Sequence, residues 1–596
     1  MHVVATAGHV DHGKSTLVRA LTGSDPDRLE EERRRGLSIE LGYAWTALPG
    51  ADGRPPVDVA FVDVPGHQRF VSTALAGVGP VPVALFVVAA DDPWMPQAAE
   101  HLAALDALGV SHGVLAVTRC DLADPAPALA RAREELARTS LREAPAVVVS
   151  GRTGAGLDRL RAVLAEVLAG VPSPDPGADV RLWVDRRFTV HGTGTVVTGT
   201  LTAGTVAVGD VLAVGDRPVR VRGLESLGRP VQRASGVARV ALDLGGRAPE
   251  ALTRGSVLTT PDAFEQTSLV DVELRGGGDA RLPERPVLHV GAARTAVRAR
   301  PLGAHHARLA LEQPLPLRVG DRAILRDPGS RTVWGVRVLD PVPPALGRRG
   351  AAAARAAELA TYDGTAAGRF ATRDLERRSL LRRIGVDDAT LPSGTVATGD
   401  WLVSPAGADR LRRELVTAVE RLATPLQPGV PERALARELG LPDPGLVAAL
   451  VERPLRIEHG RVHHRSVSDL PPALAAAVDA LRADLADAPF VAPTADRLAE
   501  LGLDPRSVAA LHRSGHLLRL AEGVVLLPGA DLRATELLAD IPRPFTASEA
   551  RQALGTSRRV VLPLLDHLDR TGRTVRLPDD RRRLRGPVDD LAGHHT

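Results

Sequence analysis

The hydrophobic positions of residues 1–170 form short apolar runs separated by stretches with helical spacing. The runs are typical of buried strands: HVVATA at 2–7, VDVAFVD at 57–63, VALFVVAA at 83–90, GVLAVT at 113–118 and AVVVS at 146–150. The amphipathic stretches between them supply crossover helices, as in a parallel sheet covered by helices. We therefore expect an α/β domain over residues 1–172.

The pattern changes after VPSPDPG at 171–177, where prolines and glycine end the helical spacing. From there to about residue 340, short strand-like runs are separated by glycine turns. This pattern predicts two β-barrel domains, over 178–262 and 263–342. The proline-rich PVPP at 341–344 ends the β region.

The last part of the chain is rich in Ala, Leu and Arg and repeats an order of helix, turn, second helix and two short strands. Copies of this order lie at 433–464, 497–528 and 549–584, with a weaker copy at 369–405. The order is that of the winged helix, and the repetition indicates tandem modules. We expect these modules at 345–424, 425–470, 471–530 and 531–596. A plain all-helical scaffold is the alternative.

Length and composition exclude several classes of protein. A chain of 596 residues is too long for one hydrophobic core. The net charge of only +3 means that binding to nucleic acid would have to come from local basic patches. Cys120 is the sole cysteine, which excludes an internal disulfide framework and a multi-cysteine zinc site and suits a reducing cytoplasm. Because no apolar run reaches the roughly 18 residues of a membrane span, we expect a cytoplasmic protein with no membrane partner.

Lys14 is the only lysine of the chain, since every other Lys or Arg position is arginine. A compact ammonium fits between two phosphates of one nucleotide, whereas arginine suits carboxylates and RNA phosphates. Lys14 stands in GHVDHGKS at 8–15, which matches the phosphate-loop pattern between a predicted strand and a predicted helix. Backbone N–H groups of such a loop point at phosphates, while Lys14 reaches the β and γ oxygens and Ser15 ligates Mg²⁺.

Every residue of this loop and the helix start is a candidate for nucleotide binding. They are Gly8, His9, Val10, Asp11, His12, Gly13, Lys14, Ser15 and Thr16. The alternative is a glycine-rich turn between strand and helix that binds nothing. Further elements that follow downstream in the expected order favour the nucleotide site.

Two downstream motifs complete the predicted site. DVPGH at 63–67 follows a strand, so Asp63 can hold the Mg²⁺ shell through water and the Gly66 amide can sense the γ-phosphate. TRCD at 118–121 ends another strand, where Asp121 can accept two hydrogen bonds from the guanine edge and so select GTP. Thr118 and Arg119 of this motif, and Ser150 and Gly151 of SGRTGAG at 150–156, complete the base pocket. A strand-terminal Asp taken alone is more often a turn residue or a helix cap.

These motifs together resemble a translational GTPase. RGLSIELGYAW at 35–45, DVPGHQRF at 63–70 and LAGVGPVPVALFVVAADD at 75–92 resemble the bacterial selenocysteine-specific elongation factors (SelB), and the resemblance covers essentially the whole chain. It implies that the hydroxyl of Ser38, where the family usually has threonine, ligates Mg²⁺ in the GTP state. It also implies that His67 is the catalytic residue that orients the attacking water, with slow hydrolysis until a ribosome aligns the loop. Thr118 and Arg119 depart from the Asn-Lys of related factors, and we expect Arg119 to lay its stem over the purine.

The segment at 185–210, DRRFTVHGTGTVVTGTLTAGTVAVGD, resembles the second domain of elongation factor Tu, which holds the aminoacyl end of tRNA. A selenol is ionised at neutral pH, so arginine is a suitable partner for distinguishing it from a serine hydroxyl. The resemblance places the selenocysteine pocket at Tyr43, Arg186 and Arg239, with a weaker claim for His191. The alternative is that Tyr43 packs against the preceding segment while the arginines make surface ion pairs.

The segment at 545–586 resembles the last winged helix of the SelB family, which binds an mRNA hairpin. Ten arginines face four aspartates between 551 and 585, and such a local excess suits phosphate contacts. The candidate RNA-binding residues are Arg558, Arg559, Arg573 and Arg581. A lone arginine run is usually a solvated face, so the two arginines at a predicted helix start are the stronger candidates.

The resemblance implies a cytoplasmic monomer that delivers selenocysteine to the ribosome at UGA codons with GTP hydrolysis. Its cofactors would be GTP and Mg²⁺, and its partners selenocysteinyl-tRNA, the selenocysteine insertion hairpin of mRNA and the ribosome. The alternative function is a GTP-controlled regulator whose winged helices bind DNA and whose barrels act only as a scaffold. The barrel segment at 185–210 disfavours that alternative.

Overall fold

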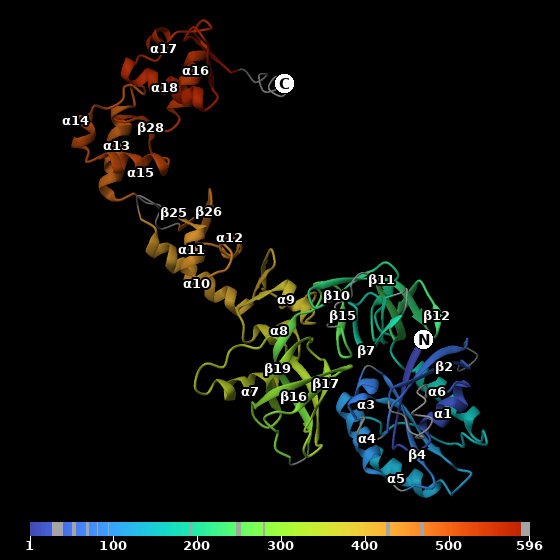
Figure 1. The fold of residues 1–596 in the computed structure, drawn as a ribbon. Helices are drawn as coiled ribbons and strands as arrows, with labels where there is room; N and C mark the ends of the chain where they lie inside the picture. The colour runs from blue at the N-terminus through green and yellow to red at the C-terminus, as the bar shows by residue number, and fades with distance from the viewer. Residues whose placement is uncertain are drawn as a thin grey trace. The chain divides into compact units, whose positions relative to one another are not determined.

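The computed structural model describes residues 1–26, 40–50, 55–66, 71–79, 81–92, 94–190, 194–245, 252–277, 280–424, 429–464 and 470–585. The chain divides into two compact units, Met1–Pro392 and Ser393–Thr596, and each is described by itself. The division falls inside the range 345–424 that the repeat pattern predicts as one module. Figure 1 shows the elements of both units.

A six-stranded sheet forms the centre of the first domain, in the order β2-β3-β1-β4-β5-β6. Its strands are β1 (His2–Ala7), β2 (Gly42–Leu48), β3 (Val57–Asp63), β4 (Val83–Ala89), β5 (His112–Thr118) and β6 (Ala146–Val148). β1 pairs in parallel with β3 and β4, whereas the edge strand β2 is antiparallel to β3. The α/β prediction is confirmed, and β2 is an edge strand that the apolar runs did not indicate.

Helices cover both faces of this sheet (Figure 1). On one face, strand residues such as Val62 and Phe86 form a core with α3 (Val71–Val78), α4 (Pro96–Leu108) and α5 (Ala126–Leu136). On the other face, residues such as Phe61 and Leu85 pack against α1 (Lys14–Thr22) and α6 (Leu157–Ala169). Adjacent strand residues enter opposite cores because side chains alternate across a sheet.

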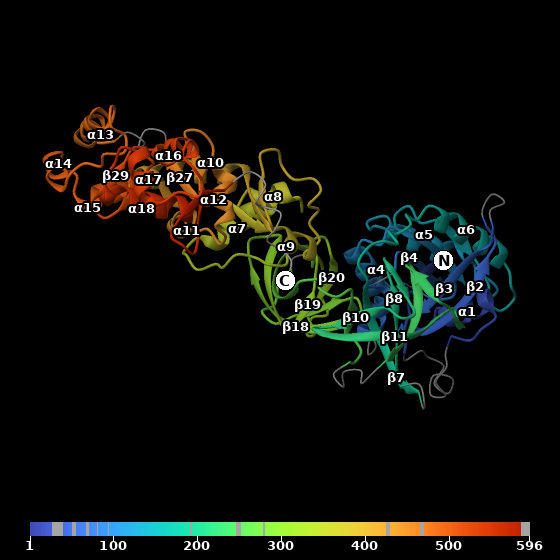
Figure 2. The ribbon, with the colours of Figure 1, turned by 90° about the horizontal axis from the view of Figure 1, so that it is seen from above.

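The first barrel closes through six strands in the order β10-β15-β7-β8-β14-β11, since β10 also pairs with β11. They are β7 (Arg181–Val190), β8 (Gly194–Leu201), β10 (Val211–Val214), β11 (Arg217–Ser226), β14 (Ala238–Gly245) and β15 (Val257–Thr259). β12 (Arg229–Pro230) extends the sheet at β11, and β9 (Thr205–Ala207) pairs with β13 (Arg233–Ser235). The barrel lies against the first domain (Figure 2). At this contact, a Cβ on Gly228 would come within 2.7 Å of the Trp45 ring.

The second barrel is also closed, in the order β16-β19-β18-β17-β20-β21. Its strands are β16 (Gln266–Gly276), β17 (Val287–Val290), β18 (Ala293–Pro301), β19 (His306–Pro316), β20 (Arg322–Arg326) and β21 (Val333–Asp340). Ile324 of β20 is part of the core that α4 forms with the sheet. The first domain and the second barrel therefore share buried apolar surface.

A buried network of charges fixes the segment after the second barrel, which contains α7 (Ala351–Thr361), α8 (Ala366–Phe370), β22 (Leu375–Arg377) and α9 (Arg378–Arg383). The pairs are Arg308–Asp271 at 2.7 Å, Arg355–Asp271 at 2.8 Å, Arg355–Asp340 at 2.6 Å, Arg369–Asp340 at 2.9 Å, Arg369–Glu376 at 2.7 Å and Arg373–Asp340 at 2.9 Å. Because α7 and α8 carry arginines of this network, they are bound to the barrel strands by ion pairs as well as by packing.

The second unit repeats short helices and β-hairpins. Its helices are α10 (Pro405–Leu422), α11 (Glu432–Glu438), α12 (Gly445–Leu450), α13 (Pro472–Asp484), α14 (Ala495–Glu500), α15 (Pro505–Arg513), α16 (Ala530–Ala539), α17 (Ala547–Ala553) and α18 (Arg558–Arg570). Its strands are β23 (Val396–Thr398), β24 (Trp401–Val403), β25 (Gly429–Pro431), β26 (Leu455–Glu458), β27 (Arg461–His464), β28 (Leu518–Ala521), β29 (Val524–Leu526), β30 (Thr574–Arg576) and β31 (Arg582–Leu584). Hairpins follow the helix pairs, which confirms tandem winged helices and contradicts the all-helical alternative.

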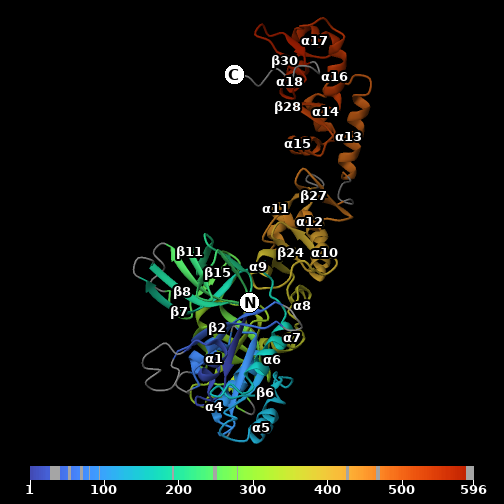
Figure 3. The ribbon, with the colours of Figure 1, turned by 90° about the vertical axis from the view of Figure 1, so that its right-hand side faces the viewer.

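The last helices pack as one group, and Figure 3 shows α16, α17 and α18 together. Their core includes Leu538, Phe545 and Leu564 and also takes in Phe490 and Leu526 from the preceding segment. Some residues of the third repeat therefore join the core of the last repeat, while the third repeat also has a core of its own that includes Leu481 and Leu511. Over the residues that the structure describes, no helix combines the length and the apolar character needed to cross a membrane.

Candidate functional site

Two glycines shape the loop between β1 and α1. Gly8 has φ +132, and a Cβ there would lie 2.2 Å from the carbonyl oxygen of Val87. Gly13 has φ +81 and stands directly before the first residue of α1. Both φ values lie in the left-handed region that favours glycine. The glycines of GHVDHGKS thus permit a loop that other residues would distort.

Lys14 is buried at the centre of this loop, with 4% of its surface exposed. Its Nζ donates hydrogen bonds to the carbonyl oxygens of Gly8 at 3.1 Å and His9 at 2.7 Å. Gly66, after β3, lies against the same group, because a Cβ there would be 2.6 Å from Lys14 Nζ and 2.5 Å from the Val10 nitrogen. The structure therefore brings the two predicted motifs together around one ammonium group.

Ser15 and Asp63 form a pair of oxygen donors beside this lysine. The Ser15 hydroxyl donates to Asp63 Oδ2 at 2.6 Å, and the Thr6 hydroxyl donates to Asp63 Oδ1 at 2.6 Å. Thr6 in turn accepts a hydrogen bond from the Val64 N–H at 3.1 Å. Hydroxyl and carboxylate oxygens are hard ligands of the kind that Mg²⁺ takes together with phosphate oxygens. The donor set fits the ion, and Thr6 is a supporting residue that the motifs did not indicate.

Two histidines of the loop are buried beside each other, with ring centroids 5.1 Å apart. Among the described residues, His9 Nδ1 has no hydrogen-bond partner. Burial lowers the pKa of His12 to about 4, so its ring is neutral at pH 7. The 3.3 Å contact between His12 Nε2 and Asp92 is therefore not an ion pair at that pH.

The predicted base-recognition motif at 118–121 is attached to the phosphate loop through its first two side chains. The Thr118 hydroxyl donates to the His12 carbonyl oxygen at 2.7 Å. The Arg119 guanidinium donates to the Asp11 carbonyl oxygen and to Asp91, the latter at 3.2 Å. Thr118 and Arg119 thus connect two loops within the site. The stacking of the Arg119 stem on the purine stays a prediction.

Asp121 is exposed and lies beside Ser150. A hydrogen bond from the Ser150 side chain holds the pKa of Asp121 below its ordinary value, so the carboxylate is charged at neutral pH. Gly151 lies beside α1, since a Cβ there would be 3.3 Å from Thr16 Cγ2. The structure therefore gathers the predicted base-pocket residues near the start of α1. Ser38, His67 and His191 lie outside the described residues.

The three residues predicted for the selenocysteine pocket lie together between the first domain and the first barrel. The Arg239 guanidinium carbon is 3.9 Å from the centre of the Tyr43 ring, and that of Arg186 is 4.8 Å from it. Asp185 accepts hydrogen bonds from both terminal nitrogens of Arg239, one of them at 2.6 Å. Arg186 is held by the Leu41 carbonyl oxygen and by Glu40 at 3.3 Å.

The Tyr43 hydroxyl is buried, and no described group lies in hydrogen-bond geometry with it. Burial raises the pKa of Tyr43 far above its ordinary value, so the phenol stays protonated. Tyr43 packs against the core that the sheet forms with α3, α4 and α5. The arginines are not at the surface: Arg239 has 12% of its side chain exposed and Arg186 has 28%.

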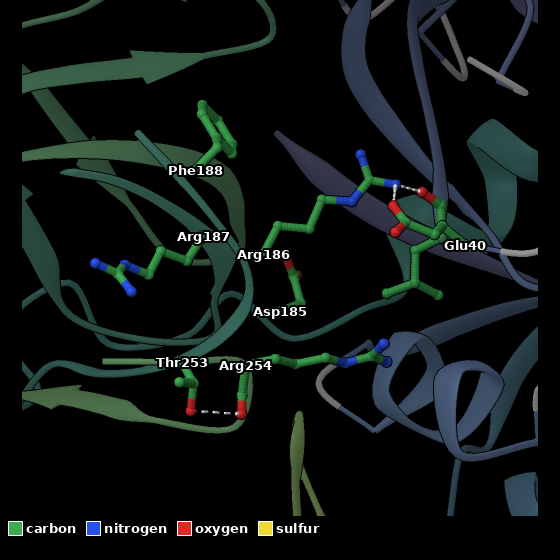
Figure 4. Close-up of a pocket in the computed structure, with 8 residues that line it drawn as sticks. Glu40, Asp185, Arg186, Arg187, Phe188, Thr253 and Arg254 are labelled. Atoms are coloured by element: carbon green, nitrogen blue, oxygen red, sulfur yellow. Dashed lines mark hydrogen bonds and ion pairs between the residues drawn. The ribbon is translucent and has the colours of Figure 1, made fainter. Parts of the chain in front are cut away.

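A cavity of about 590 Å³ opens beside this group (Figure 4). It is lined by Glu40, Leu41, Asp185, Arg186, Arg187, Phe188, Thr253 and Arg254. Arg186 reaches across toward Glu40, whereas Arg187 points the opposite way. Of the three predicted residues, only Arg186 lines the cavity. Arg254, whose guanidinium lies 3.3 Å from the Thr73 hydroxyl, is a lining residue that the sequence did not indicate.

The four predicted RNA-binding arginines have different surroundings in the second unit. Arg558, at the first position of α18, is exposed, and no partner for it is found among the described residues. Arg559 donates to the carbonyl oxygens of Ala492 at 3.0 Å and Pro493 at 2.8 Å. Arg573 lies 3.4 Å from Asp531, and Arg581 lies 4.0 Å from Asp579. The arginines therefore do not form one uniform basic face.

Three stretches of the chain match known families. Residues 1–170 match the elongation factor Tu GTP binding domain, residues 283–345 the β-barrel domain of selenocysteine-specific elongation factors, and residues 536–583 the winged helix of elongation factor SelB. The first match, together with the relatives below, makes the chain a translational GTPase, a class that uses GTP and Mg²⁺.

Relatives cover nearly the full length. The selenocysteine-specific elongation factor of Escherichia coli is 33% identical, over 97% of this chain and 98% of that protein. The one from Desulfomicrobium baculatum is 32% identical, over 97% of this chain and 99% of that protein. The crystal structure of a bacterial selenocysteine-specific elongation factor superposes with a TM-score of 0.74 at 25% identity, covering 98% of this chain and 100% of that one. These matches disfavour the DNA-binding regulator, and the chain belongs to the family of selenocysteine-specific elongation factors.

Proposed function

We propose that this chain binds GTP through the loop at 8–16 and carries selenocysteinyl-tRNA to ribosomes, held near UGA codons by an mRNA hairpin. The observation that carries the proposal is the arginine-lined cavity between the GTP-binding domain and the first barrel. A cavity in this position can respond to the nucleotide, because Glu40 and Leu41 belong to the first domain while Arg186 belongs to the barrel. We further propose that the chain acts as a cytoplasmic monomer.

In the nucleotide site, Lys14 would exchange its backbone carbonyl partners for phosphate oxygens. Ser15 would ligate Mg²⁺ directly, and Asp63 would hold the ion through water. The Gly66 amide would face the γ-phosphate, since this glycine already lies against Lys14. Asp121 would accept hydrogen bonds from the guanine edge. The bound metal and phosphates would supply charge neutralisation during phosphoryl transfer.

His67 and Ser38 complete this proposal on the basis of family resemblance. His67 follows Gly66 directly in the sequence, and Gly66 lies against Lys14 of the phosphate loop. Its role would be to position the attacking water, and that of Ser38 to ligate Mg²⁺ in the GTP state. Positioning of this kind acts on the rate of hydrolysis rather than on the affinity for GTP.

In the aminoacyl pocket, Arg186 would meet the selenolate. It lines the cavity, and its partner Glu40 is 53% exposed, so the guanidinium can exchange that partner at small cost. Arg239 would play a supporting role, because Asp185 already holds it and it lies against the Tyr43 ring. A selenolate accepts a charge-assisted hydrogen bond from arginine, whereas a serine hydroxyl carries no charge.

In the second unit, the module over 531–596 would bind the hairpin, with Arg558 contacting RNA at the start of α18. Arg573 and Arg581 lie at the hairpin strands that follow α18 and would contribute phosphate contacts. Arg559 would act chiefly by fixing the last module to the preceding one. The ranges 1–172, 178–262, 263–342, 345–424, 425–470 and 471–530 remain our proposed boundaries for the other domains.

A filter-binding comparison of the full chain tests this proposal. The three probes are selenocysteinyl-tRNA, the insertion hairpin RNA and a duplex DNA of equal length. We expect GTP-dependent binding of the tRNA, GTP-independent binding of the hairpin and weaker, strongly salt-dependent binding of the DNA. Preferential binding of the duplex DNA would contradict the proposal.

A further inference from the structure

Helix α4 contacts the phosphate loop through one histidine. The Gly8 N–H donates a hydrogen bond to His101 Nδ1 at 3.1 Å. His101 is buried, with 5% of its surface exposed. This N–H belongs to the glycine at φ +132 that begins the loop, so the contact fixes the orientation of the peptide from which the loop departs.

The contact requires a neutral imidazole with its proton on Nε2, because Nδ1 is the acceptor. Burial, together with the nearby Lys14 and His9, lowers the pKa of His101 to about 3. The ring therefore stays an acceptor throughout the physiological range of pH. A buried amide that loses its acceptor is costly, and the free loop would turn this N–H toward water instead.

The same helix contacts the second barrel through the preceding residue. Glu100 Oε1 lies 3.2 Å from Arg326 Nε of β20, and the two side chains are only 16% and 17% exposed. Close packing reinforces this contact, because a Cβ on Gly335 of β21 would lie 3.0 Å from the Ala107 backbone. Consecutive residues of α4 thus touch the phosphate loop on one side and the barrel on the other.

We propose that His101 is a positioning residue for the phosphate loop and that α4 couples this loop to the second barrel through His101 and Glu100. The inference rests on the proposed nucleotide site. The second barrel holds α4 in place, and α4 in turn holds the Gly8 peptide. A nucleotide that binds only to the ordered loop therefore also stabilises the contact between α4 and the barrel. Such coupling is reciprocal: loosening the barrel must weaken nucleotide binding by the same free energy.

The dissociation constant and dissociation rate of a fluorescent GDP analogue, measured with the full chain, test this proposal. His101→Leu removes the acceptor, and we expect the dissociation constant to rise by about 5- to 150-fold. His101→Gln retains an acceptor and should restore affinity to within about 3-fold of the unaltered chain. The matched control is His464→Leu, since His464 is also buried, with 8% of its surface exposed, but lies in β27 of the second unit. We expect this control to lower thermal stability and leave GDP affinity unchanged.

The coupling is tested by Arg326→Met, which removes the Glu100 partner without touching the loop. We expect faster GDP release, by roughly 5-fold, in the unaltered background and no further increase in the His101→Leu background. Equal GDP affinity of the unaltered chain and His101→Leu would overturn the positioning role, as would equal losses for the Leu and Gln variants. Additive effects of Arg326→Met and His101→Leu would overturn the coupling. If the unaltered chain bound no GDP, the proposed nucleotide site itself would fail.

Discussion

The Ser15 hydroxyl donates a 2.6 Å hydrogen bond to the Asp63 carboxylate, although 48 positions separate the two residues in the chain. The contact joins the first turn of α1 to the end of β3, and Thr6 holds the other carboxylate oxygen of Asp63. The two proposed Mg²⁺-site residues are therefore oriented by the protein itself. On this proposal, Ser15 and Asp63 need little reorganisation when the ion binds, whereas Lys14 must leave the Gly8 and His9 carbonyl oxygens.

Replacing Ser15 with Ala should lower GTP affinity in the presence of Mg²⁺ by at least about 10-fold, because a hydrogen bond to a charged group and a direct metal ligand are both lost. The Mg²⁺ concentration at half-maximal binding should rise. Thr22→Ala is the matched control, since the Thr22 hydroxyl is on the same helix but donates to the Val18 carbonyl oxygen. Unchanged Mg²⁺ dependence in Ser15→Ala would contradict the assignment.

Replacing Asp121 with Asn should shift preference from GTP toward xanthosine triphosphate. An amide donor complements the xanthine 2-oxo group, whereas the charged carboxylate complements the guanine amine. Competition between the two nucleotides measures the shift. Asp124→Asn, which alters an exposed carboxylate three residues further on, is a suitable control. Retained GTP selectivity in Asp121→Asn would show that this carboxylate does not read the base.

Arg558→Ala and Arg559→Ala should have different effects on the second unit. Loss of Arg558 should weaken hairpin binding by about 1–3 kcal/mol and flatten its salt dependence, with thermal stability unchanged. Loss of Arg559 should destabilise the last module, because its two backbone carbonyl partners become unsatisfied. Hairpin titrations at several salt concentrations, read beside thermal melts, separate the two effects. Equal stability losses for both variants would refute the distinction.

Replacing Asp340 with Asn should destabilise the docking of α7 and α8 by about 3–5 kcal/mol, since it leaves three arginines without a shared buried carboxylate. Hydrogen exchange of the α7 and α8 backbone amides in the full chain measures this loss of stability. Glu273→Gln, which alters an exposed pair with Arg275 on β16, should change exchange little.

The ion pairs of Asp340 also predict how the docking of α7 and α8 depends on pH. Burial alone would raise the pKa of Asp340, but Arg369, Arg373 and Arg355 together hold it below its ordinary value. A lowered folded pKa means that the stabilisation is complete above the unfolded value of about 3.9 and is lost as the pH falls through the folded value. Protection of the backbone amides of α7 and α8 from hydrogen exchange should therefore persist from pH 7 to about pH 5. Loss of protection near pH 6 would contradict this assignment.

Much of the first domain could be predicted from the sequence because its signals are local. GHVDHGKS, DVPGH and TRCD each follow a buried apolar run, and parallel strands bring such loops to one edge of a sheet. The gathering of Lys14, Ser15, Asp63 and Gly66 follows from that geometry. Thr6 and His101 carry no comparable signal, because their roles depend on contacts with residues far away in the chain.

The part of the chain that follows the second barrel was harder to predict, because its contacts also join residues that are far apart in the sequence. The weak repeat near 369–405 indicates a winged helix, yet the division between the compact units falls at Pro392, inside this stretch. Arg369 and Arg373 look like surface charges in sequence, but they pair with Asp340 of β21. Likewise, nothing local to Arg559 indicates that its partners are carbonyl oxygens more than sixty residues earlier.

The proposed selenolate pocket is the feature that would give this chain its specificity. Its most direct test measures the affinity of the GTP-bound full chain for one tRNA charged with either selenocysteine or serine, in the unaltered protein, Arg186→Ala and Arg217→Ala. We predict a preference for selenocysteine that Arg186→Ala reduces by about 1.5–3 kcal/mol, the size of a charge-assisted hydrogen bond. Arg217→Ala should preserve it, because Arg217 is an exposed residue of β11 that does not line the cavity. Equal affinity for the two charged tRNAs in the unaltered protein, or equal losses for both in Arg186→Ala, would contradict the selenolate assignment.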